Sequence, residues 1–369
     1  MSEICFIHTD QLRLGGPVTG LANTPDWLRQ RAADSVRHAV RNMIETAVSH
    51  RADFVLISGA MVSDPTDAEA AAVWLQTQLE PLRRRGIRVV ATAEATRDLA
   101  SLNRLCDIVL RRNEVLRATR RDTGSVDLSS SVTTDNATSD LIISIGQSAP
   151  SSSYGNLWYH VVPAVRSSVE TEAVSNDRRL SASAGALQAL NSSETGESGC
   201  LVVHADRSSQ RLRAVFAATD ALRFVTEQVH FNHTVSVESL TDELLRTSQT
   251  IRRSDSRTVV VNWVIDGVIA NDSDQVSRLE EQALLTRLRE ALQAGHKGVW
   301  PQSLKFSGQA TLQLTGLNGA AVEELTEVAT GHVQMIETDH LIERRSVLQS
   351  GRGIDAAYLA GLTNLSRSA

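Results

Sequence analysis

The chain has 369 residues, of which 41% are hydrophobic and 22% are charged, and its formal net charge is −6 at pH 7. This length and hydrophobic content suffice for one large domain with a smaller one, or for two of moderate size, and they exclude global disorder. The acidic balance excludes an overall attraction to nucleic acid, so any DNA contact would require a local basic patch.

Cysteine usage and hydropathy predict the cellular compartment of the protein. Cys5, Cys106 and Cys200 are far apart in the sequence and form no CxxC or Cys/His cluster. Such a set favours a reducing compartment and argues against a disulfide framework or a structural zinc. The N-terminus lacks the basic and apolar regions of a signal peptide, and no apolar run reaches the roughly 18 residues that span a bilayer. We expect a cytoplasmic protein without membrane contact.

Over the first hundred residues, short apolar runs alternate with segments of helical spacing. This alternation indicates a parallel α/β sheet covered on both faces. Ligand sites in such sheets form in the loops that follow the carboxyl ends of the strands. Those loops are predicted at residues 9–15, 59–65 and 92–98. The predicted strands are 4–8, 53–58 and 87–92, and the predicted helices are 26–50 and about 67–85.

The middle of the chain is rich in small polar residues. Residues 122–153 are predicted to form long loops around one strand at 141–145, and a second Ser/Ala-rich stretch covers 167–198. Two strands, at 199–205 and 213–217, are then predicted to pair as a hairpin that closes the first domain.

The character of the sequence changes again near residue 228. A helix at 238–252, a strand at 258–265 and a charged helix at 274–294 indicate a compact α/β unit. An amphipathic helix is predicted at about 319–330, within a polar tail. The predicted division is a first domain at 1–227, a capping domain at 228–315, and a C-terminal helix and tail at 316–369.

Short segments between about residues 3 and 310 match a known family in collinear order. Residues 6–21 read Phe-Ile-His-Thr-Asp-Gln-Leu-Arg-Leu-Gly-Gly-Pro-Val-Thr-Gly-Leu, and residues 52–59 read Ala-Asp-Phe-Val-Leu-Ile-Ser-Gly. Further matching segments follow at 86–90, 184–188, 194–200 and 218–224. Together they resemble the calcineurin-like metallophosphoesterases, specifically DNA repair exonucleases of the SbcD/YhaO type.

The resemblance implies a four-layer αββα sandwich with a small C-terminal α/β cap domain. It also implies phosphodiester hydrolysis by two Mn or Mg ions, which clamp the phosphate and generate a hydroxide at neutral pH. Members of the family hold these ions with Asp-x-His, Gly-Asp-x-x-Asp, Gly-Asn-His-Asp, His-Gly and Gly-x-His motifs. Relatives act as homodimers with a long SMC-like coiled-coil ATPase.

At the matching positions this chain carries other residue types. The Asp of Asp-x-His falls on Gln11 and its His falls on Arg13, which places a permanent cation where a cation should bind. The bridging Asp of the second motif falls on Ala60. The remaining replaced positions are Ser63, Ala95 and Thr96. We therefore predict that the two-metal site is lost and that no cofactor binds.

One observation does not depend on alignment: no histidine occurs between His50 and His160. The two central metal-binding histidines of the family are therefore missing in any register. His8, at the end of a predicted strand, is expected to be hydrogen-bonded and structural.

A displaced site is the alternative. Asp10, Asp64, Asp98 and His160 lie within about one to four residues of a replaced ligand, and a metal site could be rebuilt from them. However, a slip of one residue at a strand end turns a side chain to the opposite face. We expect instead that Arg13 forms a salt bridge with Asp10 or Glu94.

A basic cluster provides the candidates for DNA contact: Arg112, Arg117, Arg120 and Arg121, which are expected to flank the former nuclease cleft. Aromatic residues are only 4%, which does not support a base-stacking platform.

Three hypotheses follow. The leading one is a catalytically impaired exonuclease homologue, a pseudoenzyme that binds DNA or an SMC-like ATPase partner and forms a homodimer. The second is an active phosphoesterase or exonuclease with a displaced metal site. The third is a protein-interaction module without a DNA role.

Overall fold

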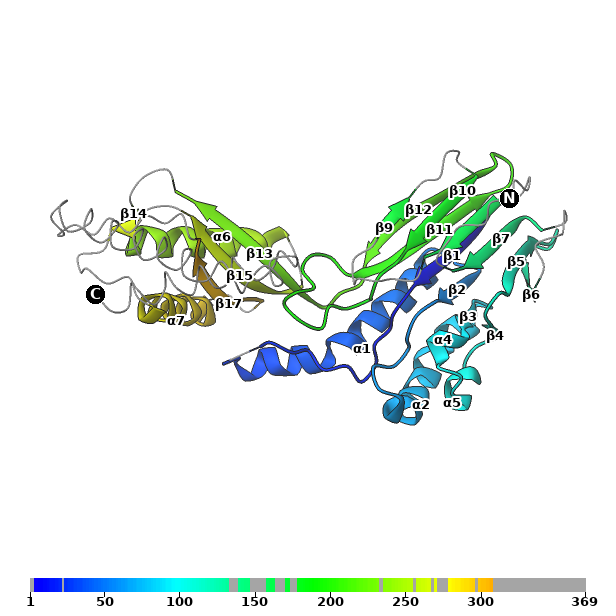
Figure 1. Cartoon of the computed structure of the whole chain (residues 1–369), viewed down its shortest axis with the longest axis horizontal. Helices are drawn as coiled ribbons and strands as arrows, with labels where there is room; N and C mark the ends of the chain where they lie inside the picture. Colours follow the sequence, from blue (N-terminus) through cyan, green and yellow to red (C-terminus); the bar gives the residue numbers. More distant parts are fainter. Residues whose placement is uncertain are drawn as a thin grey trace, which may run out of the picture.

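The computed structural model describes most of the chain up to Ser307. The described ranges are 3–21, 23–132, 139–146, 157–162, 170–172, 178–231, 235–254, 257–266, 269–270, 278–295 and 298–307. The predicted helix at about 319–330 lies outside them. Figure 1 shows a large domain and a small domain that meet near one end of the long helix α1 (Asp26–Ser49).

The first sheet of the large domain has six strands and a parallel centre. β1, β2, β3 and β4 run parallel, because each returns through a helical crossover, whereas β11 and β12 form an antiparallel hairpin beside β1. The strands, in sheet order, are β12 (Arg211–Ala218), β11 (Gly199–Asp206), β1 (Glu3–Thr9), β2 (Phe54–Ile57), β3 (Arg88–Thr92) and β4 (Ile108–Leu110).

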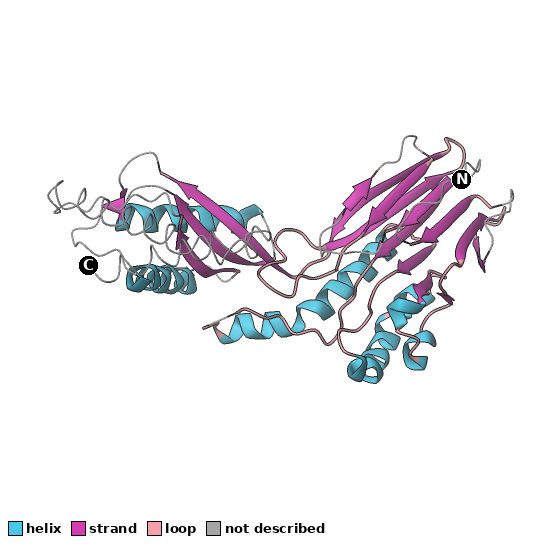
Figure 2. Cartoon of the chain, viewed as in Figure 1, coloured by secondary structure: helices cyan, strands magenta, loops and turns pink. Residues whose placement is uncertain are grey.

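The second sheet also has six strands and is of mixed direction. In Figure 2 the strands of the large domain form one side of the domain and its helices lie on the other. The strands, in sheet order, are β6 (Val126–Ser131), β5 (Val115–Arg120), β7 (Leu141–Ile145), β8 (Leu157–Val161), β10 (Arg179–Ser183) and β9 (Glu170–Glu172).

Alternation along the strands creates two apolar layers. Ile4 and Phe6 of β1 face the second sheet, where Phe6 stacks on Phe54 and meets the edge of Tyr159. Ile7 faces the helices instead. The helix layer, which packs on this outer face of the first sheet, comprises α1, η1 (Pro65–Asp67), α2 (Ala68–Gln78), α3 (Glu80–Arg83), α4 (Ala93–Thr96) and α5 (Ala100–Asn103).

The small domain is built from a parallel three-stranded sheet in the order β13-β15-β17. Two helices connect the strands and pack on one face through apolar residues such as Leu244 and Leu288. Its elements are β13 (Leu222–His230), β14 (Val235–Ser236), α6 (Val237–Ser254), β15 (Thr258–Asp266), β16 (Ile269–Ala270), α7 (Arg278–Gly295) and β17 (Val299–Phe306).

The two domains share an apolar junction. Phe224, Val260 and Trp300 on the other face of the small sheet pack against Leu28 and Ala32 near the start of α1. Burial of these large side chains on both sides of the junction stabilises the contact between the domains.

The structure confirms the mixed α/β fold class and most of the predicted elements. The helix predicted at 67–85 is divided at Leu79, where Pro81 opens α3. In the polar stretch at 122–153, the predicted strand at 141–145 is confirmed as β7, but residues predicted as loop form a further strand, β6. The small sheet begins at Leu222, earlier than the boundary predicted at residue 228. None of the described helices has the length and apolar character needed to cross a bilayer.

Candidate functional site

Four loops meet at the carboxyl edge of the first sheet. Because β1, β2 and β3 are parallel, the loops that follow them emerge at one edge. Leu12 N–H donates to Ala60 O (3.0 Å), and Met61 N–H donates to Ala95 O (2.9 Å). From the second sheet, the loop after β10 joins them, since Asp10 N–H donates to Gly185 O (3.1 Å). These backbone bonds hold the four loops as one unit.

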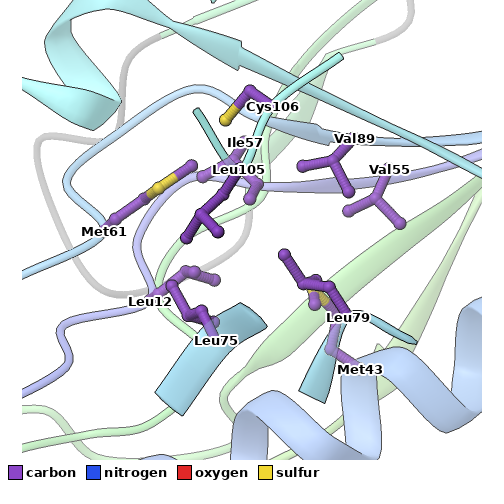
Figure 3. A pocket seen from close by; sticks show the side chains of 10 residues that line it. All are labelled: Leu12, Met43, Val55, Ile57, Met61, Leu75, Leu79, Val89, Leu105 and Cys106. Carbon is purple, nitrogen blue, oxygen red and sulfur yellow. The ribbon is translucent and has the colours of Figure 1, made fainter. Parts of the chain in front are cut away.

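Apolar side chains anchor the same loops to the core. Leu12 and Met61 point down into the helix layer, where they line a small internal cavity of about 10 Å³ with residues such as Met43 and Cys106 (Figure 3). The lining is apolar and the space is close to that of one water molecule, so this cavity does not suit a polar substrate. Burial raises the pKa of Cys106 to about 12, which keeps its thiol protonated.

Gly59 is required where the loop after β2 approaches the loop after β1. A Cβ atom at this position would collide with the backbone carbonyl of Asp10. Glycine therefore permits the close approach that brings the ends of β1 and β2 together.

Asp10 lies at the carboxyl edge of the first sheet, and only 1% of its surface is exposed. Its Oδ2 accepts hydrogen bonds from Ser183 Oγ (3.0 Å) and from the backbone N–H of Gly185 (2.9 Å). Its Oδ1 accepts from the hydroxyl of Ser58 and lies 3.1 Å from His8 Nε2. Both carboxylate oxygens are thus engaged by the protein itself, as a buried carboxylate requires.

His8 links Asp10 to the second sheet. Its Nε2 lies 3.0 Å from Ser58 Oγ and its Nδ1 lies 2.8 Å from the hydroxyl of Tyr159. His8 Nε2–H lies within hydrogen-bond distance of both Ser58 Oγ and Asp10 Oδ1, and Nδ1 then accepts from Tyr159; this tautomer is assigned from the network. The predicted hydrogen bonding of His8 is confirmed, and its structural role stays a prediction.

The network shifts the pKa values of its two ends in opposite directions. Burial alone would raise the pKa of Asp10, but attraction to His8 and hydrogen bonds from His8, Ser58 and Gly185 outweigh it, so the pKa is lowered. Tyr159 is fully buried, and burial followed by repulsion from Asp10 raises its pKa well above the ordinary value. Asp10 therefore stays ionised and Tyr159 stays protonated at neutral pH.

Arg13 lies just above this network and is held by an ion pair. Its Nη1 contacts both carboxylate oxygens of Glu194, at 2.9 and 2.7 Å, and its Nε donates to Gln11 Oε1 at 2.6 Å. Glu194 also accepts from the backbone N–H of Leu190 (3.1 Å) and from Asn191. The predicted partners of Arg13, Asp10 and Glu94, were wrong, because Asp10 is buried in its own network and Arg13 pairs with Glu194 instead.

Comparison with known proteins gives a partial match to a metallophosphoesterase. The chain is 33% identical over 89 residues to a protein of Bacillus subtilis described as the uncharacterized metallophosphoesterase YhaO. The matched segment spans 24% of this chain and 22% of that protein, and no family model matches the chain. The similarity supports a place among the metallophosphoesterases. The mixed α/β sandwich described above is consistent with that family's fold.

The residues at the replaced positions do not fit two divalent ions. Ala60 offers only its carbonyl oxygen, which already accepts from Leu12 and Arg13 N–H. Ala95 has no donor atom on its side chain and Thr96 donates its hydroxyl to Ala93 O. Ser63 donates to Arg13 O. Within the described ranges, no group of three or more His, Cys, Asp or Glu side chains could hold a metal ion.

The structure does not bring the four candidates for a displaced site together. Asp64 is exposed and caps the start of η1, accepting from the N–H and hydroxyl of Thr66. Asp98 is exposed in a left-handed turn (φ 54°). His160 faces away from Asp10, on the outer side of β8, where its Nδ1 lies 2.9 Å from Ser144 Oγ.

Sequence reasoning chose His160 and missed its neighbour Tyr159. Successive residues of a strand point to opposite faces, so only one of the two can reach His8. The inward side of β8 carries Leu157, Tyr159 and Val161, and this alternation was the signal that could have selected Tyr159. Ser58, Ser183 and Glu194 were also missed, because a serine or glutamate near the end of a strand or in a turn is typical of an ordinary polar connection.

The candidate DNA-contact arginines do not share one surface. Arg120 bonds to Glu3 O and lies 3.5 Å from Asp53, at the amino ends of β1 and β2. Its predicted position beside the cleft is therefore wrong, and the same holds for Arg121, which pairs with Asp127 at 2.8 Å in the same hairpin. The reason is that β5 is antiparallel to its neighbours and ends at the opposite edge.

The other two arginines differ in exposure. Arg117 is 7% exposed on the outer face of β5, where it neighbours Ile142 of β7. Arg112 is exposed directly after β4, which is parallel to β3, so it lies at the same edge of the first sheet as Asp10. Of the four arginines, Arg112 is therefore best placed for a ligand at this edge, and DNA contact by any of them stays a prediction.

Proposed function

We propose that the chain is a metallophosphoesterase homologue of the SbcD/YhaO type that has lost two-metal hydrolysis and acts as a scaffold for DNA or for an ATPase partner. One observation carries the proposal. The strand-end carboxylate, Asp10, is buried with both oxygens accepting hydrogen bonds from the protein, in the region where the family binds metal. Replacing those donors by a cation would leave Ser58, Ser183 and Gly185 N–H unsatisfied.

The charge at the mouth of the edge supports the same proposal. Arg13 supplies a permanent positive charge and is compensated by Glu194, so the local charge is already balanced. Two adjacent divalent ions require several bridging carboxylates and imidazoles to offset their repulsion. Ala60 and Arg13 provide neither.

Calorimetry with MnCl₂ on the intact protein tests the loss of the metal site. The expected result is no saturable heat at protein concentrations where a two-metal site would saturate, together with no manganese-stimulated hydrolysis of bis(p-nitrophenyl) phosphate. Stoichiometric, saturable manganese binding would refute the proposal. If that binding disappears in Asp10→Asn and persists in the exposed control Asp122→Asn, the displaced-site alternative is favoured.

Fluorescence anisotropy of a labelled DNA duplex over a salt series tests the scaffold role. We expect binding that weakens as salt rises, because released counterions drive contact with phosphates. Arg112→Ala should reduce the slope of log affinity against log salt by about one unit, the effect of one lost phosphate contact. Arg31→Ala, on the exposed face of α1, is the matched control. Absence of binding at low salt would favour a protein-interaction role without DNA.

A further inference from the structure

A surface groove lies in the helix layer, remote from Asp10. It is bounded by the C-terminal half of α1 on one side and by the end of α2 with α3 on the other, and its volume is about 360 Å³. α1 ends just before β2 and α3 ends shortly before β3, so the groove lies toward the amino ends of these strands. It is therefore separate from the strand-end edge discussed above and does not depend on whether that edge binds metal.

The floor of the groove is apolar. Ile44 and Val48, one turn apart on α1, face Pro81 at the start of α3. Ile44 is buried, whereas Val48 is only partly covered by the core. Apolar side chains at the base of a groove offer a surface that an aliphatic side chain of a ligand could cover.

The rim of the groove is basic. Arg41 donates to Gln78 Oε1 (3.1 Å) and Arg85 donates to Pro81 O (3.3 Å), which are both neutral acceptors. Among the described residues neither arginine has a carboxylate partner. Glu45, which also lines the groove, is the acidic residue between them. Two guanidinium groups against one carboxylate leave a net positive charge.

A tryptophan extends this basic rim along α1. The guanidinium groups of Arg37 and Arg41 lie 5.9 and 5.7 Å from the ring centre of Trp74, which is the geometry of a cation–π contact. This contact restricts the two arginines on the surface while their remaining N–H groups stay available. Pre-positioned arginines lose less conformational entropy when they bind a carboxylate.

We propose that this groove is a docking site for an acidic amphipathic helix of a partner protein. The apolar floor accepts the aliphatic stripe of such a helix, and the rim of Arg37, Arg41 and Arg85 pairs with carboxylates beside that stripe. This is recognition of a helix in a groove, with charge complementarity setting the preference. The apolar floor favours a peptide over a nucleic-acid backbone, which presents phosphates and no aliphatic side chains.

Two synthetic peptides test the proposal on the full chain. One is a helix with leucines at i, i+3 and i+7 and glutamates on either side of them, and the other carries lysines in place of the glutamates. By fluorescence anisotropy the glutamate peptide should bind about tenfold more tightly than the lysine peptide, a difference of about 1.4 kcal/mol. In the double variant Arg41→Glu/Arg85→Glu the preference should invert.

The control variant changes the net charge by the same amount at positions outside the groove. Arg31→Glu/Arg104→Glu alters two exposed arginines that do not line the groove, and the preference for the glutamate peptide should persist. Val48→Asp, which makes the floor polar, should weaken the glutamate peptide, with circular dichroism confirming the fold. Equal binding of the two peptides, or a preference that survives the Arg41/Arg85 reversal, would overturn the proposal. The proposal would also be overturned if a DNA duplex displaced the glutamate peptide from the wild type and did not bind the Arg41→Glu/Arg85→Glu variant.

Discussion

Asp10 and Asp220 are equally buried, each with 1% of its surface exposed, but the protein compensates their charges differently. Asp10 accepts hydrogen bonds from hydroxyls and a backbone N–H and neighbours one histidine. Asp220, at the junction between the domains, contacts Arg223 at 2.7 Å and Arg257 at 3.0 Å.

The difference reflects what each aspartate joins. The donors to Asp10 come from strands and loops of the two large sheets, so Asp10 closes one edge of one domain. Asp220 follows β12, whereas Arg223 and Arg257 belong to the small domain, so this ion pair joins the domains. The hydroxyl and backbone donors hold the Asp10 carboxylate in place within one domain, whereas the guanidinium groups at Asp220 also neutralise its charge across the junction.

The largest expected effect follows from breaking the junction. Asp220→Ala would leave Arg223, whose side chain is 11% exposed, with the more exposed Glu197 (2.9 Å) as its carboxylate partner in place of the buried Asp220. Removal of one partner of a buried ion pair costs about 3–5 kcal/mol, and we expect the lower end of this range because Glu197 still faces Arg223. Urea denaturation should show this loss, and limited proteolysis should cut faster between the domains. Asp122→Ala, an exposed aspartate, should change neither. If both variants behave alike, the junction does not depend on Asp220.

A smaller effect is expected at the strand-end edge. Asp10→Asn should destabilise the large domain by about 2–3 kcal/mol at pH 7, because its amide group cannot accept all the donors that face it. Urea denaturation followed by intrinsic tryptophan fluorescence measures the loss.

The same variant tests a pH dependence of the stability. The pKa of Asp10 is lowered below its ordinary value of 3.8 in the folded state. Its carboxylate therefore contributes stability above about pH 4, and this contribution is lost as the pH falls through the folded pKa. The stability difference between the wild type and Asp10→Asn should shrink below pH 4. A constant difference from pH 7 to pH 3 would contradict the lowered pKa.

Tyr159→Phe should cost less than Asp10→Asn, about 1–2 kcal/mol. It removes one hydroxyl and leaves His8 Nδ1 buried without its 2.8 Å partner. The ring and its packing against Phe6 are retained, so any loss reports the hydrogen bond. A cost as large as that of Asp10→Asn would mean that the tyrosine, rather than the carboxylate, organises the edge.

The smallest effect is expected at Arg13. Its ion pair with Glu194 joins two side chains that are 19% and 17% exposed, so solvent screens part of the attraction. A double-mutant cycle of Arg13→Gln and Glu194→Gln should give a coupling energy of about 1 kcal/mol or less. A coupling of several kcal/mol would show that this pair closes the edge as strongly as Asp220 holds the junction.

Local patterns in the sequence predicted much of the framework. Strand 4–8 became β1 (Glu3–Thr9) and strand 141–145 became β7 (Leu141–Ile145), because continuous apolar runs must be buried on both faces. The helix predicted at 26–50 is α1, since its apolar residues are spaced to form one continuous stripe on a helix and not on a strand. The edge strand β6 was missed because a strand with one solvated face has few apolar residues, and its inner neighbour β5 was missed because arginine and threonine interrupt its short apolar run.

Sequence alone also determined that Gln11, Arg13 and Ala60 stand at the positions predicted to match the metal-binding motifs, and that none of these three side chains is a carboxylate or an imidazole. Only the tertiary structure decided which groups form the hydrogen bonds and the ion pair at this edge of the sheet. Tyr159 is 151 residues from His8 and Glu194 is 181 residues from Arg13. Such partners are chosen by how strands from distant parts of the chain come into register, and local propensity carries no information about that pairing.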